Sequence, residues 1–357
     1  MTRFAFRVNA NKDIGMGHLM RCLALSEQLE KNPLFFTNDN SAVLSKIRDF
    51  GGLCHVLPTC EDDFAAMVEA FDRYPEGGLR AVSSEDQELE EILPLLKKEG
   101  IEVLITDLIC PSGEYLTALK KSGVFLVSID ELGKTVFPSH LVFNCNALSG
   151  EKRYVTNGET MVYQGVQYVL LRSEFGRAEK KRVGESVKTI LISCGGTDMK
   201  GLSLKAARAL EPLAGSFEII FVVGPDFKFR EDLEAMFSKN SRMQMVHDIK
   251  DMPSLMRRAD LAVTSGGATM YELACLGVPS IILDQYEHQN EFAGALDKSN
   301  AVINLGLGEK VKEEAIRDAV ASLFSRERRE QLSLTGQRVV DGNGAARVAR
   351  LIQEAIH

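Results

Sequence analysis

The chain has 357 residues, of which 45% are hydrophobic and 26% charged, and its formal net charge is −8 at pH 7. This length predicts roughly two globular domains, and the negative charge argues against nucleic acid or an anionic membrane surface as a partner, because both need a basic surface. The first nine residues lack the apolar stretch of a signal peptide, and no apolar run approaches the ~20 residues of a membrane span. We therefore expect a cytoplasmic protein without stable membrane insertion.

Cysteine usage favours the same compartment. Seven cysteines are scattered along the chain, and none forms a Cys-x-x-Cys pair. Zinc knuckles and redox motifs are built from such close pairs. We therefore expect free thiols in a reducing cytosol and no zinc knuckle or redox motif. We also expect that the protein uses no cofactor.

Short apolar runs alternate with helical patterns through both halves of the chain. In the first half we expect strands at 4–8, 34–37, 53–57, 103–106 and 124–129, and helices at 18–29, 64–71, 89–98 and 115–121. In the second half we expect strands at 189–193, 218–223, 243–246, 261–264 and 280–283, and helices at 202–214, 252–258, 270–276 and 292–298. Continuous apolar strands separated by helices predict parallel sheets covered on both faces.

The repetition of this pattern predicts two doubly wound, Rossmann-type α/β domains with a cleft between them. We assign residues 1–172 to an N-terminal domain and 187–357 to a C-terminal domain. The charged, apolar-poor stretch 173–186 is the expected linker, because a fresh strand follows it. An amphipathic helix is expected near the end of the chain, at 345–356.

The first candidate site follows the first strand and opens the first helix, with the sequence GMGHLMR from Gly15 to Arg21. Gly15 and Gly17 allow the backbone to turn tightly and to approach a ligand. The helix N-terminus offers free N–H groups and favours a neutral imidazole at His18, which is the form that a general base needs. Arg21 lies on the same helix face. The alternative is a plain strand–helix turn with a surface histidine.

Two acidic residues of the first half, Asp107 and Asp130, each follow an apolar strand. They would lie at the carboxyl edge of the sheet, where ligands bind to such folds. We interpret Asp107 as a candidate catalytic residue. Both acids are placed to orient water or ligand hydroxyls, and helix capping is the alternative for each.

A glycine-containing loop also follows the first strand of the second half. Its residues Gly195, Gly196, Thr197 and Asp198 fit a loop whose amides face a phosphate. The alternative is a capped turn, with Thr197 or Asp198 as the N-cap of the next helix.

The strongest motif is the segment that contains Gly266 and Gly267, where a strand ends and a helix begins near Ala268 and Thr269. The N–H groups of this helix terminus can receive a diphosphate. Glu272 lies about one turn into the helix, where its carboxylate can accept both hydroxyls of a ribose. An acid that complements the helix dipole is the alternative for Glu272.

The last candidate segment is the polar stretch 284–290, just after the strand expected at 280–283. Open α/β sheets bind ligands beyond the carboxyl ends of their strands. His288 and Gln289 are therefore placed to contact the ligand, and a solvated loop that caps the next helix is the alternative.

Together these motifs resemble the UDP-2,4-diacetamido-2,4,6-trideoxy-β-L-altropyranose hydrolases of pseudaminic acid biosynthesis and the related spore-coat polysaccharide biosynthesis proteins. The resemblance is carried by GMGHLMR at 15–21, SIDEL at 128–132, LRSEF at 171–175, GGTD at 195–198 and GGATMYE at 266–272. It covers nearly the whole chain in the right order. The second half also resembles the UDP-N-acetylglucosamine-binding domain of the lipid II-forming glycosyltransferase.

This resemblance implies a GT-B fold, a UDP-sugar substrate, no metal ion and inversion at C1 of the sugar. It gives His18 the role of the base that activates water, assigns the ribose to Glu272, and assigns the diphosphate to the glycine-rich loops. Contacts with other enzymes of a polysaccharide pathway would follow from it. The chain departs from the hydrolases at Ile109, where they carry tyrosine, and at His288, where they carry asparagine.

These inferences predict a UDP-sugar hydrolase in which water, activated by His18, attacks C1 and releases UDP. One alternative is a glycosyltransferase with the same fold and nucleotide site, which transfers the sugar to a sugar or lipid acceptor. A second alternative is a non-catalytic protein that binds a nucleotide-sugar within a surface-polysaccharide pathway.

Overall fold

The computed structural model describes residues 2–10, 15–29, 32–58, 83–148, 154–156, 158–213, 215–224, 227–237 and 242–357. The chain divides into two compact units, one made of residues 1–146, 150–173 and 343–357 and the other of residues 147–149 and 174–342. The helix expected at 64–71 and Cys60 lie outside the described residues.

The first unit is built on a parallel sheet of seven described strands, in the order β3-β2-β1-β4-β5-β7-β9. These strands are β1 (Phe4–Val8), β2 (Leu34–Thr37), β3 (Leu53–Val56), β4 (Val103–Asp107), β5 (Phe125–Ile129), β7 (Leu141–Asn144) and β9 (Met161–Gln164). A separate short pair joins β6 (Val136–Phe137) to β8 (Val155–Thr156). The strand order reverses between β1 and β4, as in other doubly wound sheets.

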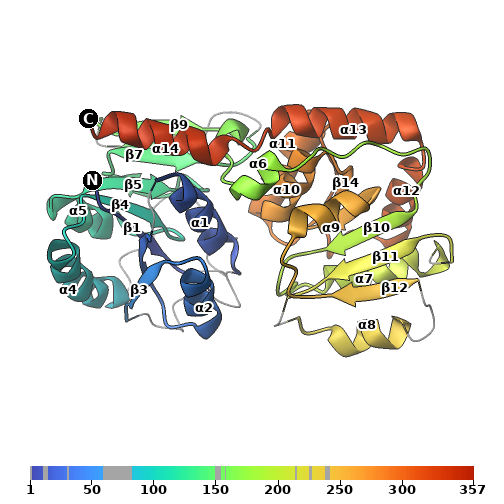
Figure 1. Ribbon diagram of the computed structural model, residues 1–357, viewed down its shortest axis with the longest axis horizontal. Helices are drawn as coiled ribbons and strands as arrows, with labels where there is room; N and C mark the ends of the chain where they lie inside the picture. The colour runs from blue at the N-terminus through green and yellow to red at the C-terminus, as the bar shows by residue number, and fades with distance from the viewer. Residues whose placement is uncertain are drawn as a thin grey trace. The chain divides into compact units, whose positions relative to one another are not determined.

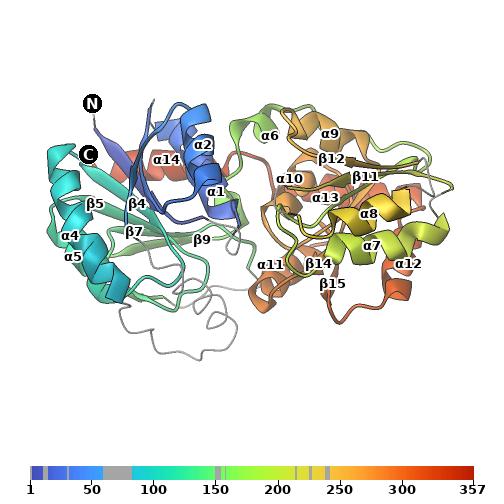
Figure 2. The same cartoon turned by 90° about the horizontal axis from the view of Figure 1, so that it is seen from below.

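Helices cover both faces of this sheet because consecutive side chains of its central strands are apolar and point to opposite faces. Helices α1 (Gly17–Leu29), α2 (Ser41–Asp49) and α14 (Gly344–Ala355) lie over one face, and α4 (Ser83–Lys98) and α5 (Gly113–Lys121) lie over the other (Figures 1 and 2). Neighbouring residues of β1 show the alternation. Phe6 belongs to the core under α1 and α14, whereas Ala5 belongs to the core under α4 and α5.

The C-terminal helix α14 corrects the expected extent of the second domain, 187–357. Residues 343–357 belong to the first unit, where α14 packs on α1. Its apolar side chains Ala345, Val348 and Ile352 complete the core of that unit. The amphipathic pattern correctly predicts the helix, but it does not say which core covers its apolar face.

The second unit has a parallel sheet of six described strands, in the order β12-β11-β10-β13-β14-β15. These strands are β10 (Thr189–Ser193), β11 (Glu218–Val222), β12 (Met243–Val246), β13 (Leu261–Thr264), β14 (Ser280–Asp284) and β15 (Ile303–Leu307). The strand order reverses again, between β10 and β13. In each unit, the strand order therefore reverses beside the first strand of that unit, and this position is the switch point of the sheet.

Helices of the second unit also form two layers. Helices α7 (Leu202–Leu210), α8 (Arg230–Phe237) and α12 (Glu313–Ser322) lie on one side of the sheet, and α9 (Met252–Arg258), α10 (Ala268–Leu276) and α13 (Arg326–Val339) lie on the other (Figure 2). Helix α11 (Glu287–Lys298) packs beside β14 and β15. The expected linker begins with the short helix α6 (Ser173–Arg177), whose Phe175 is fully buried.

Candidate active site

His18, Arg21 and Asp107 converge at the switch point of the first sheet. Asp107 ends β4, and the other two residues lie in the first turns of α1, which follows β1. His18 Nδ1 is 2.7 Å from Asp107 Oδ1. Arg21 donates from Nε to Asp107 Oδ2 and from Nη2 to Asp107 Oδ1, each at 2.5 Å. Residues expected at one sheet edge from the sequence thus form one hydrogen-bonded group.

The Asp107 carboxylate determines which nitrogen of His18 carries the hydrogen. Burial alone would raise the pKa of Asp107, but the charges and hydrogen bonds of Arg21 and His18 outweigh it and hold that pKa well below its usual range. An ionised oxygen 2.7 Å from Nδ1 requires Nδ1–H to donate. Arg21 Nη2 lies 2.9 Å from His18 Nδ1, and both nitrogens donate to the same oxygen, Asp107 Oδ1. The neutral ring therefore presents its lone pair at Nε2, as a general base does.

The exposures of the two side chains match these roles. The His18 side chain keeps 15% of its surface exposed, whereas the Asp107 side chain has none. A buried carboxylate can orient and stabilise an imidazolium without contacting the reacting molecule. Of this pair, His18 is therefore the residue that a water molecule can reach, and Asp107 positions it.

Glu131 is a member of this group that sequence reasoning missed. It follows β5 and pairs with Arg21 Nη1. Asp130, which we expected near the ligand, instead accepts hydrogen bonds from Gly133 N at 2.6 Å and from the Tyr154 hydroxyl at 2.7 Å. The SIDEL motif thus uses its first acid to hold a turn and its second to hold Arg21.

A buried network fixes the end of β1, from which this site is built. Arg7 donates from Nε to Glu88 Oε1 at 2.6 Å, and the Tyr115 hydroxyl bonds to the same carboxylate. Beyond the strand, Asn38 accepts from Ala10 N at 3.1 Å and donates to Ala10 O at 3.0 Å. These bonds tie β1 to α4, α5 and the end of β2, so the segment that leads into α1 starts from a fixed position.

Gly15 and Gly17 differ in what they contribute to the turn into α1. Gly15 has a φ of 80°, in the left-handed region that glycine adopts without strain. Gly17 begins α1, and a Cβ added at either glycine would meet nothing within 4 Å. The described side chains therefore leave open space next to both glycines.

At the switch point of the second sheet, Asp198 acts as a cap for α7. Its Oδ1 accepts from Leu202 N at 2.8 Å and its Oδ2 from Ser203 N at 2.7 Å. The N-cap residue of α7 is Gly201, so Asp198 caps the helix with its side chain from three residues earlier, and both of its carboxylate oxygens are used within the unit. Of the four residues expected in this loop, Gly195, Gly196 and Thr197 keep some exposure to solvent.

Replacing Asp198 by Ala should destabilise the protein, because two buried amides of α7 lose their acceptors. We expect the free energy of unfolding to fall by about 1–2 kcal/mol, measured by urea denaturation. The matched control is Asp251→Ala, at the exposed N-cap of α9, where one amide loses its acceptor. A larger loss at Asp251 than at Asp198 would contradict this assignment.

The loop at Gly195–Gly196 is held by two close neighbours. Gln285 Nε2 donates to Cys194 O at 2.8 Å, and Gly224 N donates to Gly196 O at 3.1 Å. A Cβ added at Gly224 would overlap Gly196 O, so glycine is needed there for space. Gln285 and Gly224 were not among the expected site residues, although Gln285 directly follows β14.

The segment between β13 and α10 leaves the start of that helix open. Gly267 is the N-cap of α10 and supplies no side-chain acceptor. A Cβ added at Gly267 would meet nothing within 4 Å, whereas one added at Gly266 would overlap Asp284 Oδ1 and lie 2.9 Å from Gln289 Cβ. Ala268 is exposed and Thr269 partly so. An uncapped N-terminus with accessible amides is suited to an anion.

Glu272 lies in α10, about one turn from its start, and is partly exposed. His288 and Gln289 lie in the first turn of α11, which begins at Glu287, so the expected polar loop is shorter than predicted. Gln289 Oε1 accepts from Gln285 N at 2.9 Å and so closes the turn that starts the helix. His288 stacks on Tyr286, with ring centroids 5.6 Å apart.

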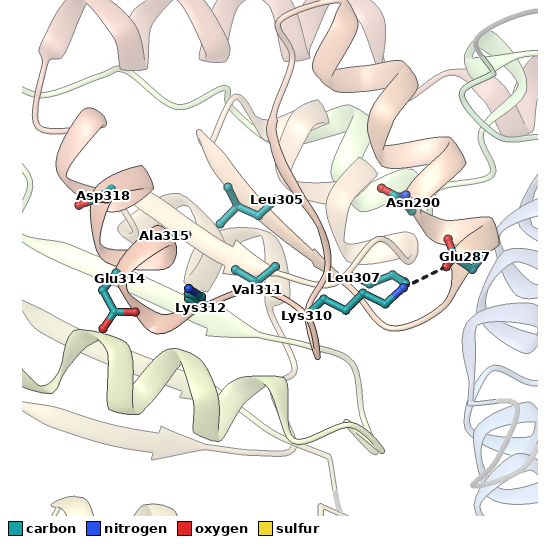
Figure 3. A pocket seen from close by; sticks show the side chains of 10 residues that line it. All are labelled: Glu287, Asn290, Leu305, Leu307, Lys310, Val311, Lys312, Glu314, Ala315 and Asp318. Carbon is teal, nitrogen blue, oxygen red and sulfur yellow. Dashed lines mark ion pairs between the residues drawn. The ribbon is translucent and has the colours of Figure 1, made fainter.

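A separate pocket of about 650 Å³ lies at the β15 edge of the second unit (Figure 3). It is lined by Glu287, Asn290, Leu305, Leu307, Lys310, Val311, Lys312, Glu314, Ala315 and Asp318. The Lys310 ammonium pairs with Glu287 across its rim, at 3.8 Å. None of the glycine-rich segments lines this pocket.

Metal-ligand clusters and membrane-spanning helices are both absent from the described part of the chain. Among them, no group of three or more His, Cys, Asp or Glu side chains is arranged to bind a metal ion. No described helix is long and apolar enough to cross a membrane.

Two doubly wound units, each with a glycine-containing segment at its switch point, are the architecture of the GT-B fold. Residues 189–342 match the glycosyltransferase family 28 C-terminal domain. The crystal structure of MurG from Acinetobacter baumannii superposes with a TM-score of 0.67, at 15% identity and 99% coverage of each chain. The spinosyn rhamnosyltransferase SpnG superposes with a TM-score of 0.66, at 15% identity and with coverage of 98% of this chain and 100% of that one. The predicted fold is thereby confirmed.

Two proteins are similar in sequence to most of this chain. The chain is 29% identical over 348 residues to the spore coat polysaccharide biosynthesis protein SpsG of Bacillus subtilis, covering 95% of this chain and 94% of that protein. It is 26% identical over 281 residues to the UDP-2,4-diacetamido-2,4,6-trideoxy-beta-L-altropyranose hydrolase of Campylobacter jejuni, covering 76% and 87% of the two chains. The resemblance predicted from the motifs is confirmed.

Proposed function

We propose that the protein is a metal-independent UDP-sugar hydrolase that inverts the configuration at C1 of the sugar. The substrate class is a UDP-linked, di-N-acetylated deoxy sugar, and the pathway class is nonulosonic (pseudaminic-type) acid or surface-polysaccharide biosynthesis. The observation that carries the proposal is the ordered His18–Asp107 pair, in which only Nδ1 of the His18 ring is engaged by the described residues. The Campylobacter jejuni relative is a UDP-sugar hydrolase, which supports the same chemistry.

In this proposal the second unit holds the nucleotide. The amides at the start of α10 and those of Gly195 and Gly196 bind the diphosphate, and Glu272 binds the ribose hydroxyls. Arg21 stays with Asp107 and Glu131, so the positive charge near the diphosphate comes mainly from helix N-termini.

The chemical step needs one base and one leaving-group site. His18 Nε2 takes a proton from water as the water oxygen bonds to C1 on the face opposite UDP. The bond between C1 and the diphosphate oxygen breaks, and UDP departs with the electron pair. Asp107 stabilises the imidazolium, and the α10 amides stabilise the charge that develops on the diphosphate.

Substrate turnover tests the proposal. The protein is incubated with UDP-2,4-diacetamido-2,4,6-trideoxy-β-L-altrose and with UDP-N-acetylglucosamine, with EDTA and without an acceptor, and UDP release is followed by NMR. We expect UDP and free sugar of inverted configuration from the altrose derivative. Binding of both compounds with release from neither would reject the hydrolase and leave a nucleotide-sugar-binding protein or a transferase.

A glycosyltransferase remains the second candidate because residues 189–342 match a glycosyltransferase domain and because Ile109 replaces the tyrosine of the hydrolases. The same NMR assay distinguishes it. A transferase would release UDP rapidly only after a sugar or lipid acceptor is added.

Adding a Cβ at Gly266 should weaken nucleotide binding. The new atom overlaps Asp284 Oδ1, so the segment at the start of α10 must move. We expect Gly266→Ala to reduce UDP affinity about tenfold or more, which corresponds to about 1.4 kcal/mol or more, measured by calorimetry. Gly267→Ala is the matched control, because nothing lies within 4 Å of its added Cβ. Equal losses in both variants would contradict the crowding argument.

A further inference from the structure

The buried carboxyl of Asp284 lies against the segment that begins α10. Asp284 ends β14, and only 1% of its surface is exposed. Neither carboxyl oxygen makes a hydrogen bond of normal geometry with a described residue, although the Asn304 side chain lies close enough to lower the pKa of Asp284. A Cβ added at Gly266 would overlap Asp284 Oδ1, so the carboxyl lies against Gly266. Gly266 belongs to residues 265–269, which we call the diphosphate loop. An unpaired acid next to an expected anion site requires an explanation, because two negative groups in one place repel each other.

Neighbouring elements supply no cation to Asp284 among the described residues. The Lys205 ammonium donates to the carbonyl of Gly308 at 2.6 Å, and the Lys310 ammonium pairs with Glu287 (Figure 3). The diphosphate loop itself, with the sequence SGGAT, has no charged side chain.

The groups that shift the pKa of Asp284 are neutral or acidic. On β15, the Asn304 amide donates to Asn290 Oδ1 at 3.0 Å. On the loop after β10, burial raises the pKa of both Cys194 and Asp198. On α11, Glu287 adds a negative charge. The surroundings of Asp284 therefore favour its neutral form.

The pKa of Asp284 reflects this environment. Burial raises it to about 7, with the Asn304 amide acting against the rise and the charge of Glu287 adding to it. Near neutral pH the carboxyl is therefore divided between two forms. A bound diphosphate would repel the ionised form and leave the protonated form in place.

Building on the proposed nucleotide site, we propose that Asp284 makes anion binding at the diphosphate loop proton-linked. A diphosphate binds while the Asp284 carboxyl is protonated, and binding at alkaline pH takes up one proton. Asp284 thus determines the pH range in which the protein holds a nucleoside diphosphate ester.

Calorimetry with UDP-N-acetylglucosamine tests this inference between pH 6 and pH 8.5. This ester is a suitable probe because it lacks the terminal phosphate that titrates near pH 6. Above pH 7 we expect its affinity to fall by up to about tenfold per pH unit. Titrations in two buffers of different ionisation enthalpy should show uptake approaching one proton at pH 8.5.

Asp284→Asn is the decisive variant, because the amide has the shape of the protonated acid and cannot ionise. We expect it to bind the probe with the same affinity at pH 6 and pH 8.5 and without proton uptake. Asp318→Asn, at an exposed acid on α12, is the matched control and should behave as the unchanged protein. A wild-type pH slope in Asp284→Asn would overturn the inference, because another group, such as His18, would then carry the linkage.

Two further outcomes separate this inference from the proposed function. Binding by the unchanged protein that is equally tight at pH 6 and pH 8.5, without proton uptake, would overturn the role of Asp284 and leave the nucleotide site intact. Failure of the unchanged protein to bind either UDP-N-acetylglucosamine or UDP would overturn the nucleotide site itself and the inference with it. The proton-uptake measurement needs no variant, so it stands even if Asp284→Asn does not fold.

Discussion

Replacing His18 by Ala is expected to abolish turnover of the UDP-sugar and to leave UDP affinity nearly unchanged. His18 is the only member of its hydrogen-bonded group that is assigned a proton-transfer role, and a positioned base contributes about 10²–10⁴ in rate. The nucleotide contacts are proposed to lie on the second unit, so removal of an imidazole from α1 should not weaken them. Turnover is measured by NMR release of UDP, and affinity by calorimetry.

The control for this variant is His247→Ala, which removes an exposed imidazole that pairs with its neighbour Asp248. It should retain both turnover and affinity. Loss of turnover and UDP binding together in His18→Ala would show that His18 has a structural role. Unchanged turnover would remove His18 from the mechanism.

Replacing Asp107 by Asn is expected to give the second largest effect. The amide Nδ2 donates where the carboxylate accepted, so the His18 ring should place its hydrogen on Nε2 and lose its basic nitrogen. A comparable aspartate-to-asparagine change in serine proteases lowers turnover about 10⁴-fold, and we expect a loss of about 10²–10⁴ here. Asp130→Asn is the control, because its carboxyl holds a turn and not the His18 ring. Equal losses in turnover would contradict the assignment of roles.

Asp107→Asn should also lower stability, with a defined dependence on pH. Arg21 loses its principal partner and keeps Glu131, so the loss should be about 2–4 kcal/mol, somewhat below that of a fully buried pair. The pKa of Asp107 is lower in the folded chain than the ~3.9 of an unfolded one, so its contribution is present above about pH 4 and is lost as pH falls further. Urea denaturation should therefore show a smaller difference between the two proteins at pH 3 than at pH 7. A difference that grows on acidification would contradict the ion pair.

The sequence predicted much of the fold because its parallel strands are short, apolar and buried. The expected strands at 4–8, 34–37 and 189–193 coincide with β1, β2 and β10. Elements without such a signal were missed. Helix α13 (Arg326–Val339) has the sequence RERREQLSLTGQRV, which lacks a clear apolar stripe, and the edge strand β15 is only partly buried along its whole length.

Individual residues of the candidate site could be predicted from the sequence, but the contacts between them could not. Residue types and glycine spacing indicated His18 and Arg21, and Asp107 was recognised as an acid at a strand end. Their convergence depends on β4 pairing with β1, a strand order that no local pattern encodes. For the same reason Glu131 was missed, and Asp284 was recognised as part of a polar segment but not as a buried acid without a partner.

The central claim is that water activated by His18 attacks carbon, not phosphorus. Turnover of UDP-2,4-diacetamido-2,4,6-trideoxy-β-L-altrose in ¹⁸O-labelled water tests it directly, with the label located by mass spectrometry of the sugar and by ³¹P NMR of UDP. Samples are taken early, before water exchanges with the free sugar at C1. Attack at C1 predicts ¹⁸O in the sugar and none in UDP. Label in the terminal phosphate of UDP would contradict the account, because the bond broken would then be the one between phosphorus and oxygen.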